Sequence, residues 1–425
     1  MFGSRNMRTQ RSLTVLIRAV ALSLSGMVLA SSAWAEKDED YSRWNEISSQ
    51  AAAKAAEMIR NRSAQQITPA SSAEKDTAPA SSAEKDTAPA SSAEKDTDTE
   101  YSRWSKVGER AAAKAAEMIR QQSPQFKKKN SIALTNAGYA EINGQSTMPA
   151  LDGLSKALKV SRGAHSLIEI HSSSTTPLWF AVCDQNSGNC AYLQVDPAAP
   201  ENEEASLFSK EAVEQVNAEH IFAHPQDYAS KFDAKIFGGN EFRIVTIANA
   251  LTAGVSSKVV RAFEFHDHYC PGVTSGILMA AYIEQHFSGK LFIQSIQPWC
   301  KEDALQVILN TTPGKKDYDV LYPTEADLAS WPEWAQLSST IVYSYDSAAE
   351  IWHGAALQFI WNEDTCPDYG HSIMNKLCKD LLYVDKMDRP EDFVTIKHEF
   401  TLPAGVAPKE LAGPGIDPVE LIEAL

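Results

Sequence analysis

The amino-acid sequence predicts an α+β fold, a mixed helix and sheet body preceded by a disordered and helical repeat arm. Two observations support this prediction. From residue 127 onward, stretches of alternating apolar residues and stretches with helical spacing follow one another without a strict β-α-β order. Before that point the chain repeats itself and is rich in alanine, serine and charged residues. The body of about 300 residues suits one large or two modest domains, and we divide it into residues 127–256 and 257–425.

Residues 1–35 have the organisation of a secretory signal peptide. Four arginines and no acidic residue accompany an apolar core at residues 19–30, and Ala33-Trp34-Ala35 provides a small-x-small cleavage site. The leader is too short and wrongly flanked for a membrane span, and no later run approaches the ~18 apolar residues that a membrane helix needs. We therefore expect an exported protein, periplasmic or secreted, with a bacterial-like Sec signal.

Residues 36–126 contain a duplicated segment. Tyr41-Ser42-Arg43-Trp44 recurs from Tyr101, and the alanine-rich residues 51–60 recur unchanged at 111–120. The tandem Pro-Ala-Ser-Ser-Ala-Glu-Lys-Asp-Thr repeats between the copies have nothing to bury and are expected to be disordered, whereas the alanine-rich copies are strong helix formers. Two interpretations stay open: a spacer with two short helices, or a docking module that binds a protein partner through its tyrosine and tryptophan.

Residues 127–256 are expected to begin the α+β body. Short runs rich in β-branched and aromatic residues predict strands, and two of these runs flank a turn-rich tip, which predicts a hairpin. Apolar residues at helical spacing predict the helices between them. The expected elements are a helix that includes 154–158, strands at 167–171, 178–182 and 190–195, a helix at 206–218 and a strand at 242–247.

Residues 257–425 open with two predicted helices on either side of a motif rich in histidine and cysteine. Val273, Ile277, Ala281 and Glu284 recur at the spacing of one helix face, which predicts the second of these helices. A short apolar run and a further helix follow, and Pro-Gly marks a turn. The expected elements are helices at 257–265 and 273–287, a strand at 291–296, a helix at 301–309 and a turn at 312–316.

The charge of the chain excludes one class of partner. Its 39 basic side chains, four of them in the leader, face 55 acidic ones, so the mature chain carries about 20 negative charges in excess. A surface of this sign argues against nucleic acid and anionic membranes as partners. It is compatible with cations as ligands.

Six cysteines in an exported chain have to be considered as disulfides. Cys183 and Cys190 flank the predicted hairpin tip, so this pair can close a small loop. Cys366 and Cys378 flank another short segment and can do the same. Cys270 and Cys300 then remain.

The stretch around Cys270 has the strongest chemical signal. His266, His268 and Cys270 lie within five residues, and imidazole with thiolate is a ligand set that suits zinc, and also nickel, cobalt or copper. Cys270 precedes a predicted helix N-terminus, where the dipole and unpaired N–H groups favour thiolate. Two alternatives stay open: the histidines cap the preceding helix while Cys270 is a buried thiol, or Cys270 forms a disulfide with Cys300.

These residues resemble a known family. His266-x-His268-x-Cys270-Pro271-Gly272, followed by Gly276 and a helix, resembles the signature of the FmdE family, which takes its name from formylmethanofuran dehydrogenase. Cys300-x-x-Asp303-Ala304-x-Gln306-Val307 resembles its second element, and Thr312-Pro313-Gly314-Lys315 resembles its turn. The resemblance is strongest from about 257 to 320. Asp267 stands where the family usually has glycine, and Thr311 where many members carry a further cysteine.

The resemblance implies an α+β domain with a Cys/His metal site, most often zinc, and frequent homodimers. We expect His268, Cys270 and Cys300 to form the core of this site, with His266 as fourth ligand or as a neighbour of the ligands. Three further residues are candidate binding residues around it. Asp303 is expected to orient a histidine or to act only as a helix N-terminal charge, Gln306 to point to the same site, and Lys315 to bind an anionic ligand or to be an ordinary exposed lysine.

Three functions from different classes follow from the sequence. The first is an exported protein that holds a transition metal, with Zn²⁺ preferred over Ni, Co or Cu, for storage, transfer or sensing. The second is a metal-dependent enzyme with an open coordination position for activated water. The third is an interaction protein with a structural metal. No general base accompanies the motif, so no catalytic residue is assigned and the first function is preferred.

Overall fold

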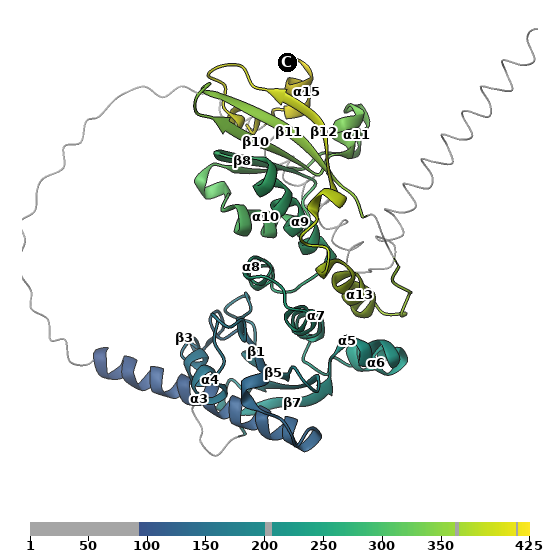
Figure 1. The fold of residues 1–425 in the computed structure, drawn as a ribbon. Helices are drawn as coiled ribbons and strands as arrows, with labels where there is room; N and C mark the ends of the chain where they lie inside the picture. Colours follow the sequence, from purple (N-terminus) through teal and green to yellow (C-terminus); the bar gives the residue numbers. More distant parts are fainter. Residues whose placement is uncertain (1–92, 200–205, 362–364, 414) are drawn as a thin grey trace, which may run out of the picture. The chain divides into compact units, whose positions relative to one another are not determined.

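The structure is a computed structural model that describes residues 93–199, 206–361, 365–413 and 415–425. The predicted signal peptide, the first copy of the duplicated segment and most of the tandem repeats lie outside these residues. The described residues form helices and mixed sheets, so the predicted α+β class is confirmed (Figure 1). Among them we find no helix with both the length and the hydropathy of a membrane span.

The first described helix, α3 (Ala93–Gln122), contains the second copy of the duplicated segment. Its Trp104, Ala111, Ala115 and Ile119 are at most 1% exposed and belong to a core shared with helix α4 (Ala150–Leu158) and the adjacent sheet. Alanine at i and i+4 leaves a flat face that can approach a sheet closely. The second copy is therefore part of the folded body and not a spacer, and the composition boundary at residue 127 does not mark where the fold begins.

The first sheet has the strand order β4-β1-β5-β6-β7, with β1 and β4 parallel and the other neighbours antiparallel. Its strands alternate between two cores, as the pleat requires. In β5, Phe180 and Val182 face the core with α3 and α4. Trp179 and Ala181 face the core with helices α7 (Glu241–Thr252) and α8 (Ser257–His266). The strands are β1 (Ser131–Thr135), β4 (Leu167–Glu169), β5 (Trp179–Asp184), β6 (Asn189–Val195) and β7 (Phe208–Gln215).

Two predictions for this part were wrong. The helix expected at 206–218 is the edge strand β7, which pairs with β6 along its length. Its lysine and glutamate residues have helical propensity, but pairing with a neighbouring strand overrides it. The strand expected at 242–247 lies in helix α7 (Glu241–Thr252). That short apolar run continues into buried Ala248 and Ala250, and a short apolar run alone does not distinguish a strand from a buried helix.

The second sheet has the order β12-β11-β10-β8-β9, with only β8 and β9 parallel in this part of the structure. Ile293 and Val342 face one core with helices α9 (Pro271–His286), α10 (Lys301–Leu309) and α13 (Ser372–Val384). Ile341 and Tyr343 face another core with short helices near the C-terminus. The strands are β8 (Lys290–Ile296), β9 (Tyr318–Leu321), β10 (Thr340–Asp346), β11 (Ile351–Phe359) and β12 (Val394–Thr401).

Helix α9 (Pro271–His286) connects the two regions. It is buried on all sides from Pro271 to Ala280, as expected for a central helix. Val273 and Ile277 pack in the core that also contains α7 and α8, while Leu278 and Ile283 pack under the second sheet. The remaining helices are α5 (Ala218–Ala223), α6 (Pro225–Asp233), α8 (Ser257–His266), α10 (Lys301–Leu309), α11 (Glu325–Ser330), α12 (Glu333–Leu337), α13 (Ser372–Val384), α14 (Pro408–Leu411) and α15 (Pro418–Glu423).

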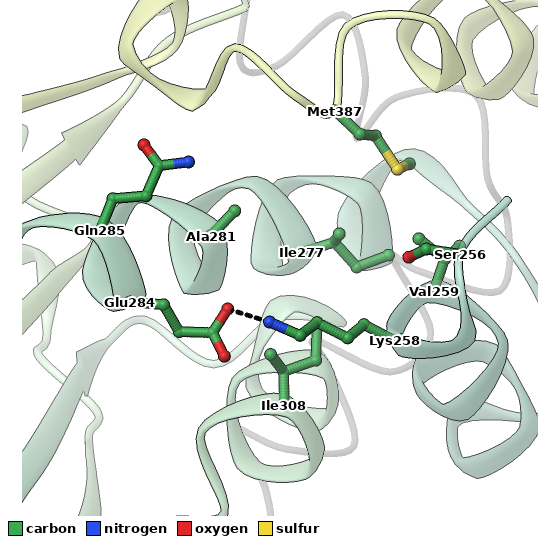
Figure 2. Close-up of a pocket in the computed structure, with 9 residues that line it drawn as sticks. All are labelled: Ser256, Lys258, Val259, Ile277, Ala281, Glu284, Gln285, Ile308 and Met387. Carbon is green, nitrogen blue, oxygen red and sulfur yellow. Dashed lines mark hydrogen bonds and ion pairs between the residues drawn. The ribbon is translucent and has the colours of Figure 1, made fainter.

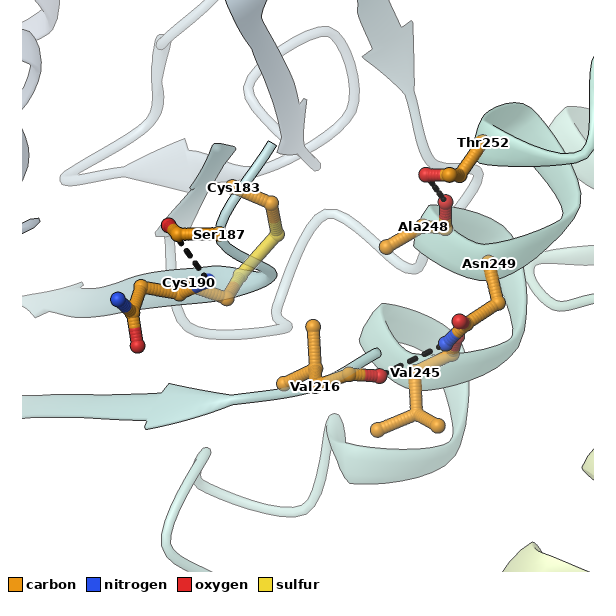
Figure 3. The surroundings of a disulfide bond; sticks show 9 residues. Cys183, Ser187, Cys190, Val216, Val245, Ala248, Asn249 and Thr252 are labelled. Carbon is orange, nitrogen blue, oxygen red and sulfur yellow. Dashed lines mark hydrogen bonds between the residues drawn. A yellow bond between two sulfur atoms is a disulfide. The ribbon is translucent and has the colours of Figure 1, made fainter. Parts of the chain in front are cut away.

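The cysteines pair as the sequence predicted. Cys183 and Cys190 form a disulfide across the β5–β6 hairpin, and Cys366 and Cys378 form a second one. Figure 3 shows the first disulfide beside α7, whose Asn249 donates a hydrogen bond to the carbonyl of Val216. Cys270 and Cys300 are free, so the alternative of a disulfide between them is wrong.

Candidate metal centre

The turn between α8 and α9 presents three of the predicted ligands. Helix α8 ends at His266, and Asp267 follows in the left-handed conformation with φ 70°. This residue turns the chain so that His268 and then Cys270, the N-cap of α9, return toward His266. Glycine adopts this conformation without strain and aspartate tolerates it. The FmdE-like glycine position therefore needs a left-handed backbone, which Asp267 supplies here.

The fourth predicted ligand comes from a different segment. Cys300 is the N-cap of α10, and α10 packs against α8 and α9. Two glycines of α9 allow this approach. A Cβ at Gly272 would lie 2.6 Å from Trp299 Nε1 and 2.8 Å from Cys300 Cβ, and one at Gly276 would lie 2.7 Å from Lys301 Cα. The glycines of the motif thus set how closely Cys300 approaches Cys270.

The four predicted ligands converge. One donor atom from each of His266, His268, Cys270 and Cys300 lies within 4.8 Å of the other three. The two imidazole rings have centroids 4.4 Å apart. Cys270 is 5% exposed, while the side chains of His266 and His268 are 13% and 24% exposed. Cys270 is therefore the most buried of the ligands, whereas Cys300 and the two histidines are partly exposed.

Both histidines have a carboxylate partner. His266 Nδ1 lies 2.7 Å from Asp303 Oδ2, and His268 Nδ1 lies 2.5 Å from Asp267 Oδ1. Arg243 Nη2 in turn donates to Asp267 Oδ2 at 2.5 Å. Metal-bound histidines typically have this arrangement, because a carboxylate on one ring nitrogen fixes the ring and leaves the other for the metal.

One atom of the site has no partner within the described part of the chain. His266 Nε2 is buried there without a hydrogen bond. Burial of an unpaired ring nitrogen costs about 1–3 kcal/mol, and a metal ion at the centre of the cluster would remove this cost. The donor set and this orphaned nitrogen fit a transition-metal ion held by His266, His268, Cys270 and Cys300.

The electrostatics of the cysteine pair differ from the sequence expectation. Thiolate was expected at Cys270, but the hydrogen bond to Cys300 and burial raise the pKa of Cys270 well above its usual value. The same hydrogen bond lowers the pKa of Cys300, and the neighbouring imidazoles of His266 and His268 lower it further against the effect of burial. Without metal, the Cys270 thiol therefore donates to a Cys300 thiolate.

The ionisation of His266 also depends on its neighbours. Burial on its own lowers the pKa of His266, but the hydrogen bond to Asp303 and the neighbouring Cys300 thiolate outweigh this and raise it to about 9. Burial raises the pKa of Asp267, while His268 and Arg243 together lower it below its usual value. The metal-free site thus combines an imidazolium at His266 with carboxylate and thiolate anions.

The loop before Cys300 is fixed by a buried ion pair. Lys301 Nζ donates to Glu302 Oε1 at 2.5 Å and to the carbonyl of Gln297 at 2.8 Å. The other carboxylate oxygen of Glu302 accepts the backbone N–H of Trp299. Lys301 and Glu302 are 5% and 6% exposed. These bonds hold the chain that places Cys300 in the cluster.

The three other predicted binding residues have different surroundings. Asp303 lies in the first turn of α10 and forms a hydrogen bond with His266, in agreement with the expectation that it orients a histidine. Gln306 is half-buried one turn further along α10. Lys315 donates to the backbone carbonyl of Asn310 at 2.8 Å. For Gln306 and Lys315, a role in binding stays a prediction.

Sequence reasoning missed two contributors. Arg243 lay in the segment predicted as a strand, so nothing indicated that it would reach Asp267. Asp380 of α13 is 1% exposed, its Oδ1 lies 3.4 Å from Thr274 Oγ1, and burial raises its pKa well above the usual value. The charge of Asp380 in turn raises the pKa of Cys270 further, and no sequence pattern indicated the position of Asp380.

A hollow of about 420 Å³ lies elsewhere along α9 (Figure 2). Ile277 and Met387 contribute apolar surface to it, and Lys258 bonds Glu284 at 2.5 Å on its wall. None of the four cluster residues lines this hollow. The cluster is therefore not part of this hollow.

The segment that carries the four candidate ligands matches a known protein family. Residues 265–346 match the FmdE family. The family is described as "FmdE, Molybdenum formylmethanofuran dehydrogenase operon". The match to FmdE confirms the resemblance predicted from the motifs, and its residues contain all four candidate ligands together with Asp303, Gln306 and Lys315. The FmdE segment runs from the end of α8 through β10. Comparison with curated proteins finds no match.

The carboxylate on His266 gives the first testable prediction. Replacement of Asp303 by asparagine is expected to weaken metal binding by about 10- to 100-fold, because the partner that orients the ring and raises its basicity is lost. Competition with a chromophoric chelator measures the affinity. The exposed Glu325→Gln on α11 is the control and should leave the affinity unchanged. An affinity of Asp303→Asn within twofold of the wild type would contradict the role of Asp303.

Proposed function

We propose that this protein is an exported zinc-binding protein that holds the ion at His266, His268, Cys270 and Cys300 for storage, transfer or sensing. One observation carries the proposal: two segments of the chain bring two imidazoles and two free thiols within 4.8 Å of one another. The FmdE match to the same residues supports it.

The donor set favours zinc. Two nitrogen and two sulfur donors in a tetrahedral arrangement are typical of Zn²⁺. Thiolate and imidazole also bind nickel, cobalt and copper, and copper binds such sites more tightly than zinc at equilibrium. The choice among these ions therefore depends on their availability to the protein, and zinc is our proposal.

Export is supported by two features of the chain. Residues 1–35 have the pattern of a secretory leader. The structure contains two disulfides, which form and persist mainly in oxidising compartments. A homodimer, which the family resemblance implies, stays a prediction.

Holding or transfer fits the site better than catalysis. The cluster supplies four protein donors, whereas catalytic zinc sites typically supply three and leave one position for water. The nearest carboxylates, Asp267 and Asp303, are engaged with the histidines and are not free to act as bases. Partial exposure of the two imidazoles gives a route for ion exchange, which a purely structural site would not require.

Metal analysis of the purified mature chain tests the proposal. We expect about one zinc per chain by mass spectrometry, and less than one tenth of this in Cys270→Ala. The exposed His353→Ala serves as control, since His353 lies on β11 outside the cluster, and it should retain the ion. Equal metal content in all three proteins would refute the site assignment.

The same protein distinguishes storage or transfer from a structural role. A chelator is expected to remove the ion within minutes while the circular dichroism spectrum stays folded, and added zinc should restore the original content. Unfolding upon metal removal would instead favour an interaction protein with a structural metal. Turnover of a substrate that stops upon metal removal would favour the enzyme.

A further inference from the structure

Helix α3 occupies a groove formed by α4 and the strands β5 and β6. The face that it buries is made of small and apolar side chains in the second copy of the duplicated segment. These buried residues are Trp104, Val107, Ala111, Ala112, Ala115, Ala116, Met118 and Ile119. The groove thus accommodates the buried side chains of one short segment, residues 104–119.

The first copy of the segment carries the same face. Sixty residues earlier in the chain, each of these residues has an identical counterpart, except that isoleucine replaces Val107. The counterparts are Trp44, Ile47, Ala51, Ala52, Ala55, Ala56, Met58 and Ile59. The first copy lies outside the described residues, but as a helix it would present the same apolar surface to the groove.

Polar contacts of α3 also have counterparts. Tyr101 donates a hydrogen bond to Asp152 at 2.9 Å, and Lys114 pairs with Glu211 at 3.1 Å. Ser123 accepts from Asn189 at 2.8 Å. At the corresponding positions the first copy has Tyr41, Lys54 and Ser63. The partners on the groove are therefore complementary to either copy.

Two differences favour the second copy. A Cβ at Gly108 would lie 2.9 Å from the carbonyl carbon of Ala150, which is too close for a side chain, and the first copy has Ser48 at this position. Glu109 pairs with Lys156 at 2.7 Å, and the first copy has Ser49 there. The groove should therefore prefer the copy that fills it in the structure, with the first copy as a weaker competitor.

We infer that residues 41–60 are a second occupant of the α3 groove of the same chain. The 40 residues between the two copies, 61–100, give a tether long enough for either copy to reach the groove, and tethering keeps the local concentration of the free copy in the millimolar range. When α3 leaves the groove, the first copy takes its place. The duplication thus allows one copy of the segment to replace the other in the groove, while the rest of the fold stays the same.

A double-mutant cycle in the full chain tests the inference. Ala115→Glu places a charge on the buried face of α3, and Ala55→Glu places the same charge on the first copy. If the first copy is a second occupant, Ala115→Glu lowers the melting temperature more in the Ala55→Glu background than in the wild type, by 5 °C or more. Ala55→Glu alone leaves the melting temperature unchanged. An equal loss in both backgrounds overturns the inference.

Four further variants make this result decisive. Ser48→Gly removes the side chain that would meet Ala150, so it should raise the melting temperature of the Ala115→Glu chain. Leu154→Ala in the groove itself is the control and should be equally destabilising in all backgrounds, because it affects both occupants. If Ala115→Glu does not fold in either background, Ala115→Val and Ala55→Val are compared in the same way, and equal losses again overturn the inference.

The molar mass of the Ala115→Glu chain separates exchange within a chain from exchange between chains. Light scattering is expected to give a mass unchanged from that of the wild type. A mass doubled relative to the wild type would show that the first copy fills the groove of a second chain, which overturns the inference for the same chain. The four metal-site residues lie outside this core, so metal content is expected to stay constant throughout.

Discussion

Replacement of Cys300 by serine is expected to weaken zinc binding by about 100- to 1000-fold. Binding of structural zinc by four protein ligands is worth roughly 10–16 kcal/mol near neutral pH, so loss of one thiolate ligand removes about 3–4 kcal/mol. Cys300 is the thiolate of the metal-free pair, because the hydrogen bond from Cys270 and the two neighbouring imidazoles lower its pKa. Its loss therefore removes the donor that is already deprotonated and ready to bind.

Cobalt substitution makes this loss visible. The wild-type chain with Co²⁺ should show the intense thiolate-to-cobalt absorption of a site with two sulfur ligands, and Cys300→Ser should show about half of it at saturating metal. Ser275→Ala, a change on α9 close to the site in sequence but outside the ligand set, is the matched control. An unchanged spectrum in Cys300→Ser would remove Cys300 from the site and with it the convergence of the two segments.

Zinc affinity is expected to fall steeply as the pH decreases from 9 to 7. In the metal-free site the pKa of His266 is raised to about 9, so below that pH its imidazole carries a proton that the metal must displace. Cys270 also carries a proton in this range because its pKa is raised. Each displaced proton lowers the apparent affinity by about tenfold per pH unit, so the two together account for about 100-fold per unit.

Calorimetry in buffers of different ionisation enthalpy counts these protons. We expect about two protons released per zinc at pH 7 and fewer above pH 9, where His266 is already neutral. Asp303→Asn removes the hydrogen bond that raises the pKa of His266, so this variant should release close to one proton at pH 8. An affinity that stays constant between pH 7 and pH 9 would show that the metal does not bind His266 and Cys270.

The local elements around the site could be predicted from the sequence. Regular helical spacing and the Pro-Gly start of α9 gave the bounds of α8, α9 and α10 to within one or two residues. The cysteine pairs that close short loops could also be predicted, because one pair flanks a hairpin tip. Such patterns are local, so no knowledge of the tertiary structure is needed to recognise them.

Other features depend on contacts between distant segments, and the sequence did not reveal them. Residues 206–218 have helical propensity, yet β7 forms because the edge of β6 is available for pairing. The helical conformation of 242–247 matters for the site, since it places Arg243 beside Asp267. The relative acidity of Cys270 and Cys300 likewise depends on burial and on which thiolate the imidazoles stabilise, which no spacing along the chain reveals.

Helix α9 follows directly after the proposed ligand Cys270, and its buried apolar residues contribute to two separate cores. A shift or rotation of this helix would disturb side-chain packing against both sheets at once. Substitutions anywhere along it, including those far from any histidine or cysteine, are therefore constrained by the coordination geometry at its first turn. The sixteen residues of α9 therefore have two roles at once: they fix the position of a metal ligand, and they fill the interior between the two sheets.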